Sequence, residues 1–255
     1  LISKIQIPFL HFASWQISYL VGGTLGLMLL ILRMGTFESG TFEKIKSTNI
    51  RRGNFLMLFS NKERALRYLA CIAIGLPVWY SVGILIKFSK KFAALQGIEI
   101  DISLAIVFTY LGLSFGDLLS SILSQFFKSR KKTVYIYLLA SVMVIITYLF
   151  YPHKSESFFY GLCFMIGTAT GYWALFVSMS AELFGTNIRA TVASTTPNFV
   201  RGAVVPLVLT FKAWEDAMGM IPAATILGII SLGLAFWGIS HVKESFGKDL
   251  DFQEY

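Results

Sequence analysis

The chain has 255 residues, of which 55% are hydrophobic and 14% are charged, and its formal net charge is +8. Ordinary soluble domains contain about 25% charged residues. A soluble core of this length cannot bury so much apolar surface, so the composition excludes an ordinary soluble enzyme. The basic excess falls between long apolar runs, which indicates membrane topology rather than a nucleic-acid partner.

Apolar runs predict one membrane span, a linker and six further spans, because about 18 apolar residues are enough to cross a bilayer. Residues 1–14 are interpreted as the end of an earlier span and a short turn, and residues 15–32 as a span that ends at Arg33. Backbone groups in lipid bond within their own segment, so the expected class is an all-α integral membrane protein. The six further spans are expected at residues 66–86, 102–127, 134–150, 158–183, 191–211 and 218–239.

The linker, residues 34–64, is basic and is interrupted by Gly35, Gly40 and Gly53. Its apolar segment 54–59 is interpreted as lying on the membrane surface, and its basic stretch 44–52 as touching the head groups of membrane lipids. Most Lys and Arg residues outside the spans fall on the linker's side, which places the linker and the tail, residues 241–255, in the cytoplasm. The expected location is a plasma membrane, in bacteria the inner membrane.

Glycines recur at a spacing of four in three spans, and such pairs let helix backbones approach closely. We therefore expect a tightly packed bundle. Pro197 and Pro206 lie in one span and predict a bent helix. Cys71 and Cys163 fall inside spans and are expected to be reduced packing residues. The glycine pairs are Gly22 and Gly26, Gly112 and Gly116, and Gly167 and Gly171.

Three stretches resemble the second half of a major facilitator superfamily transporter. Residues 15–33 and the following Glu38-Ser39 are similar to the sixth helix and the Pro-Glu-Ser segment of sugar-porter-like and metabolite:proton symporter members, with Phe37 in place of Pro. The most specific stretch is Ala-Glu-Leu-Phe-Gly-Thr-Asn-Ile-Arg-Ala-Thr at residues 181–191, which resembles the joint between helices ten and eleven and departs from it only at Gly185.

The third stretch, residues 116–132, is similar to a degenerate copy of the family's basic loop. Arg130 and Lys131 match the basic pair of that loop. Gln125, Phe126 and Lys128 stand where the loop usually has Asp, Arg and Gly. The resemblance therefore implies that the loop's shape is kept, without its usual carboxylate.

The resemblance implies the C-terminal six-helix bundle of a twelve-helix major facilitator fold, together with the last helix of the N-terminal half. On this interpretation residues 1–33 end the N-terminal half, 34–64 form the central linker, 65–240 form the six-helix half and 241–255 the tail. The chain is then a fragment whose principal partner is the missing N-terminal half of the same protein, and it is not expected to transport alone.

Charged residues at membrane depth are costly and need a reason. Asp117 and Arg201 each lie near the middle of an expected span. A carboxyl group there can bind and release a proton as its surroundings change between wet and dry, so Asp117 is the predicted proton-coupling residue. Arg201 stays charged and can bind an anionic solute through two hydrogen bonds. The alternative, which the sequence leaves open, is a static ion pair or two residues that only fix packing.

Aromatic residues inside the spans are further candidates for contact with a solute, and the alternative for any one of them is packing against lipid or between helices. The predicted substrate-binding residues are Trp79, Tyr80, Tyr172, Trp173, Asn198 and Arg201.

A gate is expected at the cytoplasmic end. Glu182 and Arg189 flank the turn after the fourth of the six spans and are expected to bond to the basic loop through Arg130 and Lys131. Exposed pairs of this kind contribute only about 0–1 kcal/mol. A gate needs only a bias of that size between two states.

The three histidines have no metal-ligand spacing, and no nucleophile elbow or phosphate-binding loop occurs, so no metal, cofactor or enzymatic activity is expected. The predicted function is secondary active transport of a small polar or anionic organic solute by alternating access, coupled to protons. The alternatives are a six-helix channel or membrane assembly protein that acts alone, and an intramembrane enzyme. An enzyme would need a polar cluster that Asp117 and Arg201 alone do not provide.

Overall fold

The computed structural model describes residues 13–34, 53–152, 155–249 and 251–254, and the chain divides into one unit at 1–49 and another at 50–255. Regular structure in these residues is helical, and six helices are long and apolar enough to cross a membrane. The predicted all-α, multi-pass membrane class is therefore confirmed for the described residues. Residues 1–12 of the span end expected at 1–14 lie outside them. So do residues 35–52 of the linker, which include its basic stretch 44–52.

The first unit contributes helix α1, Ser14–Met34, with 21 residues. At a rise of 1.5 Å per residue the helix is about 30 Å long, which matches the hydrocarbon thickness of a bilayer. The glycine pair Gly22 and Gly26 lies within this helix.

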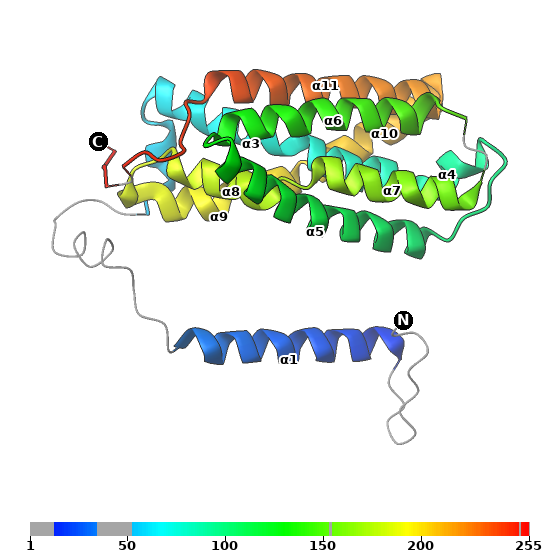
Figure 1. Cartoon of the computed structure of the whole chain (residues 1–255), viewed down its shortest axis with the longest axis horizontal. Coiled ribbons are helices and arrows are strands. Elements are labelled where there is room, and N and C mark those ends of the chain that lie inside the picture. The colour runs from blue at the N-terminus through cyan, green and yellow to red at the C-terminus, as the bar shows by residue number, and fades with distance from the viewer. Residues whose placement is uncertain (1–12, 35–52, 153–154, 250, 255) are drawn as a thin grey trace. The chain divides into compact units, whose positions relative to one another are not determined.

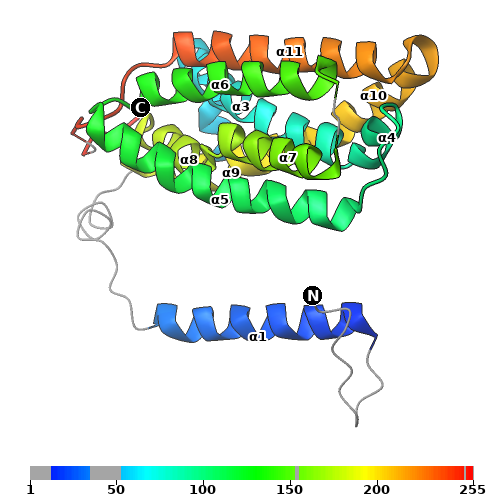
Figure 2. The same ribbon diagram turned by 45° about the vertical axis from the view of Figure 1, so that its right-hand side comes forward.

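The second unit is a helical bundle (Figure 1). Helix α3 packs against α11, α9 and α8, while α6 lies beside α11 and α7 lies beside α5, as Figure 1 and Figure 2 both show. The helices are α3 (Lys62–Tyr80), which continues as the π-helical segment η3 (Ser81–Ile86), α5 (Ile102–Phe126), α6 (Arg130–Phe150), α7 (Glu156–Thr170), α8 (Trp173–Glu182), α9 (Thr186–Gly202), α10 (Val204–Met218) and α11 (Met220–His241). Two short pieces, η2 (Phe55–Phe59) and α4 (Ser89–Ala94), lie outside the spans.

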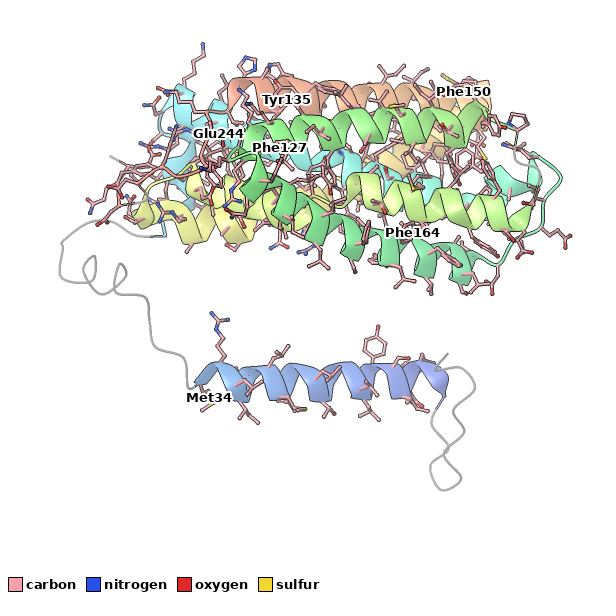
Figure 3. All side chains as sticks on the ribbon, in the orientation of Figure 1. Met34, Phe127, Tyr135, Phe150, Phe164 and Glu244 are labelled. Atoms are coloured by element: carbon pink, nitrogen blue, oxygen red, sulfur yellow. The ribbon has the colours of Figure 1, made fainter. Side chains whose placement is uncertain are left out.

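Small residues fill the contact between α5 and α7. A Cβ added to Gly112 would lie 2.1 Å from the Phe164 carbonyl oxygen, and one added to Gly167 would lie 2.0 Å from the Thr109 carbonyl oxygen. Figure 3 labels Phe164 on α7, on the side of the bundle where α5 runs. The two helix backbones therefore touch, which confirms for these two spans the close approach predicted from the glycine spacing.

Three of the expected spans are interrupted. Helix α3 contains Pro77 and becomes π-helical after Tyr80. Helix α7 ends at Thr170 and α8 begins at Trp173, so the prediction of one continuous helix at 158–183 is wrong at residues 171–172, although the two pieces together are long enough to span.

The third interruption separates α9 from α10 at Ala203, three residues before Pro206. A proline has no N–H to bond the preceding turn, which weakens the helix at that point. The interruption lies between Pro197 and Pro206, and the bend expected from these prolines stays a prediction. The prediction of one continuous span at 191–211 is wrong, because the helix is interrupted at Ala203. Neither α9 nor α10 by itself is among the six helices long and apolar enough to cross a membrane.

Residues 55–59 form a single helical piece on the bundle rather than a free surface segment. Leu58 is fully buried, and Phe55 stacks on Phe199 of α9 with 5.9 Å between ring centroids. Leu56 is 73% exposed. The segment packs against α3 and α9, and its expected place at the membrane surface stays a prediction.

The glycine contact gives the first testable prediction. Gly167→Ala places a methyl group against the backbone of α5, and we expect it to lower the free energy of unfolding by about 1–3 kcal/mol, the usual cost of overpacking. Gly161→Ala in the same helix is the matched control, because nothing lies within 4 Å of its added Cβ. Thermal unfolding in detergent measures both. Equal midpoints for the two variants would contradict the close contact.

Candidate functional site

A cavity of about 370 Å³ opens between α3, η3, α5, α8 and α9. Its volume falls in the usual range for small-molecule sites, about 300–1,000 Å³. The cavity adjoins all three interruptions, since its lining includes residues next to the start of η3, the start of α8 and the end of α9. It is lined by Val78, Trp79, Val82, Tyr110, Leu113, Ser114, Asp117, Trp173 and Arg201.

Asp117 lies on α5, one residue after Gly116. Its Oδ1 accepts a hydrogen bond of 2.9 Å from the backbone N–H of Ala174, in the first turn of α8. Helix α8 has no side-chain cap from its own N-cap residue, Tyr172. The carboxylate of Asp117 therefore caps α8 from another helix, and the partial positive charge of a helix N-terminus favours a negative group there.

Arg201 lies in the last turn of α9 and is exposed. Its guanidinium lies over the ring of Trp173, 5.3 Å from the centroid, and its Nη1 donates a 3.1 Å hydrogen bond to Oδ1 of Asn198. Trp173 in turn makes an edge-on contact with Trp79, with 6.0 Å between centroids. The indole pair and the guanidinium form one wall of the cavity.

The two charged residues of the cavity do not pair with each other. The ion pairs found within the described ranges do not include Asp117 or Arg201. The static Asp117–Arg201 pair, one of the alternatives left open by the sequence, is thus absent from this structure. Each charge is instead held separately, the carboxylate by a helix N-terminus and the guanidinium by an amide and an indole.

The structure separates the other predicted substrate-binding residues from this cavity. Tyr80 and Tyr172 are fully buried, and their hydroxyls donate to the backbone oxygens of Ala224 (2.7 Å) and Ile74 (2.8 Å). Both tyrosines tie helices together and neither lines the cavity. Asn198 lines a neighbouring hollow of about 560 Å³ on α9 and α10.

Helix α9 carries a polar stripe on its exposed side. Thr191, Ser194, Asn198 and Arg201 recur at spacings of three and four, which places them on one helix face. Lipid does not solvate such a stripe, so in a membrane it faces water or another polypeptide. Tyr110 and Ser114 were missed as cavity residues, although their spacing from Asp117 places all three on one face of α5.

A second set of predicted residues meets where the tail, residues 242–254, crosses the end of the bundle. Arg130 donates to both carboxylate oxygens of Glu182, from Nη2 at 3.0 Å and from Nε at 3.3 Å. The expected contact between Glu182 and the basic loop is therefore present. Lys131 bonds instead to the carbonyl oxygens of Ser240 and Val242 at the end of α11.

Arg189 belongs to the same end of the bundle. Its Nε donates to the Phe184 carbonyl oxygen at 3.2 Å, and its guanidinium lies 6.0 Å from the ring centroid of Phe252 in the tail.

Glu244, which the sequence reasoning missed, caps the start of α6 from the tail. Its carboxylate accepts from the Ser129 hydroxyl and from the backbone N–H groups of Arg130 (2.9 Å) and Phe246 (3.0 Å). Figure 3 labels Glu244 at the same end of the bundle as Phe127. Burial raises the pKa of this carboxyl, but the hydrogen bonds outweigh burial and the pKa lies below its ordinary value of 4.5.

Glu254 is the second tail carboxylate that was missed. It forms ion pairs of 3.0 Å with Arg64 and with Arg67 at the start of α3. Its backbone also exchanges two hydrogen bonds with the side chain of Asn187. The signal available in the sequence was weak, because Glu244 and Glu254 are two of four acidic residues in a tail of mixed charge.

Within the described part of the chain no group of His, Cys, Asp and Glu is arranged to hold a metal ion, and Cys71 and Cys163 are buried free thiols. Comparisons with models of known protein families, with curated proteins and with solved structures find no match to the chain. The described residues form an all-helical protein with six candidate membrane spans.

The tail cap of α6 predicts a pH dependence. The pKa of Glu244 is lowered on folding, so its stabilising effect is present above its ordinary pKa of 4.5 and is lost as the pH falls through the lowered pKa. We expect Glu244→Gln to reduce the free energy of unfolding by about 1–3 kcal/mol near neutral pH, and this loss to shrink in acid. Unfolding in detergent at several pH values measures it.

Asp249→Asn is the control for that experiment, because Asp249 is exposed in the same tail and its carboxylate accepts from the nearby N–H of Asp251. It should leave the unfolding free energy nearly unchanged at each pH. A Glu244→Gln effect of the same size at neutral and at acid pH would contradict the charged cap.

The Arg130–Glu182 pair predicts a measurable coupling. Both side chains are less than one fifth exposed, at 16% and 17%, and two hydrogen bonds join them. A double-mutant cycle with Arg130→Gln and Glu182→Gln should give a coupling of about 1–2 kcal/mol in unfolding. The Lys91–Glu215 pair, whose lysine is 59% exposed, is the control and should give less than about 0.5 kcal/mol. Additive Arg130 and Glu182 effects would show that the pair contributes nothing.

Proposed function

We propose that the protein is a proton-coupled secondary transporter of a small polar or anionic organic solute, working by alternating access in the major facilitator manner. The observation that carries the proposal is the cavity in which Asp117 and Arg201 both lie without pairing to each other. Ionisable groups inside a membrane bundle are rare and costly, and they often mark pathways for solutes and protons.

The broken helices support the same function. The cavity is lined at the points where α3 turns π-helical, where α7 gives way to α8 and where α9 gives way to α10. In secondary transporters, discontinuous helices place backbone groups and helix ends at the binding site near the middle of the membrane. Here a backbone N–H in the first turn of α8, that of Ala174, donates to Asp117, which is the residue proposed to carry the proton.

The bonds at the tail end support motion of the bundle as one body. Arg130, Lys131, Glu182 and the tail connect the start of α6 to the ends of α8 and α11. Alternating access is largely rocking of one rigid half against another around a fixed site. We propose that these residues, with Arg189, hold the cytoplasmic end together and gate the cavity from that side.

The proposal extends the resemblance of three sequence stretches to a major facilitator half. On that basis the described bundle is the C-terminal half of the transporter, an N-terminal half is its partner, and the location is a plasma or bacterial inner membrane. The polar stripe on α9 supports a partner or a water-filled path at that face, since lipid alone does not satisfy it.

Asp117→Asn tests the proton coupling. Asparagine keeps an oxygen that can accept from the Ala174 N–H, so the cap of α8 is retained, but the amide cannot bind a proton. We expect uptake driven by a pH gradient to fall at least about tenfold, while exchange of solute across the membrane without a gradient continues. The measurement uses the full protein in proteoliposomes with a panel of radiolabelled sugars, organic acids and amino acids.

Asp216→Asn, which makes the same change at an exposed residue of α10 outside the cavity lining, is the matched control and should keep gradient-driven uptake. Unchanged gradient-driven uptake in Asp117→Asn would rule out Asp117 as the coupling residue. Free passage of ions without saturation would favour a channel instead.

A further inference from the structure

The cavity combines a cation with aromatic surface in a fixed arrangement. The guanidinium of Arg201 lies over Trp173, and Trp79 meets Trp173 nearly at right angles, with an interplanar angle of 80°. A third aromatic residue, the exposed Tyr110, belongs to the same lining. A ligand in this space therefore meets ring faces and ring edges beside a permanent positive charge.

Arg201 retains hydrogen-bond capacity for a ligand. A guanidinium has five N–H donors in one plane, and within the described residues its hydrogen bond to Asn198 uses one of them. A guanidinium that lies over an aromatic ring keeps its other in-plane donors available, and a carboxylate is the group whose two oxygens match them. The hydrogen bond to the amide of Asn198 limits the rotation of the guanidinium, so its remaining donors are oriented toward a ligand from one direction.

Asp117 restricts the charge of that ligand. Its carboxylate lines the same small cavity and is held in place by the N–H of Ala174. A second carboxylate on the ligand would meet this like charge at membrane depth, where the repulsion is poorly screened. The cavity is therefore suited to a single negative charge, placed at Arg201, with a neutral remainder.

We propose that the cavity binds small aromatic monocarboxylates, with the carboxylate on Arg201 and the ring against Trp79, Trp173 and Tyr110. Aromatic rings prefer offset or edge-to-face contacts with one another, and the crossed indoles provide both. The volume of about 370 Å³ is near the lower end of the range for small-molecule sites, which favours a single ring. The inference rests on the proposed function, because the bound acid is the solute that the transporter would carry.

Direct binding tests the inference separately from transport. Isothermal titration of the full protein in detergent, near neutral pH, uses 4-hydroxybenzoate as the probe. Two analogues dissect the chemistry: 4-hydroxybenzyl alcohol keeps the ring without the carboxylate, and cyclohexanecarboxylate keeps the carboxylate without the aromatic ring. We expect 4-hydroxybenzoate to bind at least tenfold more tightly than either.

Three variants locate the site. Arg201→Gln and Trp79→Leu should each weaken 4-hydroxybenzoate at least tenfold, and Trp79→Leu should leave cyclohexanecarboxylate nearly unchanged. Lys212→Gln removes the same charge from the neighbouring helix α10 and should leave all three affinities unchanged. Arg201 is exposed and Arg201→Lys keeps its charge, so Arg201→Lys serves as a second variant should Arg201→Gln prove unstable.

Equal binding of the three compounds, or tight binding of 4-hydroxybenzoate that survives Arg201→Gln, would overturn the assignment. Uptake of the probe into proteoliposomes separates this failure from failure of the proposed function. Gradient-driven uptake of another solute without binding of 4-hydroxybenzoate overturns the ligand class and leaves transport standing. Binding with the expected variant pattern but without uptake supports the ligand class and counts against proton-coupled transport.

Discussion

The interior of this bundle depends on one close approach between two backbones. Gly116 of α5 and Gly171, at the end of α7, come so near that a Cβ on Gly171 would lie 2.7 Å from the Cα of Gly116. This contact brings the next residue of α5, Asp117, to the start of α8, whose first N–H groups have lost their partners in the break. An unbonded N–H costs several kcal/mol in an apolar interior. The glycines therefore position the carboxylate, and the carboxylate makes the break in the helix tolerable.

Backbone groups at other helix ends also find charged side chains as hydrogen-bond partners. A helix leaves four N–H groups and four carbonyl groups without partners. Here Glu244 bonds to the N-terminus of α6, and Lys131 bonds to the C-terminal carbonyls of α11. Each charge has the sign that the helix dipole favours. Asp117 at the start of α8 follows the same rule inside the bundle, so one electrostatic pattern recurs at both places.

Much of the fold follows from the sequence because lipid imposes a simple rule: apolar runs of sufficient length become helices. The glycine pairs at 112 and 116 and at 167 and 171 also predicted a real contact, since spacing alone puts them on one helix face. The break at residues 171–172 was not predictable, because it depends on Gly116 and Asp117 in a distant segment. The role of Tyr80 and Tyr172 was equally hidden, since a span that is apolar on all sides does not reveal which aromatic faces the core.

The cavity was foreseeable in part for a similar reason. Asp117 and Arg201 were recognisable as candidates because charge is rare in a span, and Trp79 and Trp173 lie beside them. The cap on α8 and the contact of Arg201 with Trp173 join residues far apart in the sequence, so only the three-dimensional structure reveals them. Glu244 and Glu254 escaped notice because a charged tail has no periodicity, and their partners lie far away in the sequence.

The pair between Arg64 and Glu254 has a consequence for the order in which the protein assembles. The two residues are separated by 190 positions, and Arg64 is only 3% exposed once they meet. During synthesis Arg64 emerges long before its carboxylate exists, so at that stage it is a solvated charge beside a newly inserted helix. A positive charge next to a membrane helix favours the cytoplasmic side of the membrane. Arg64 is thus suited to fix the topology of α3 first, and to become a buried structural group only when the last segment of the bundle arrives.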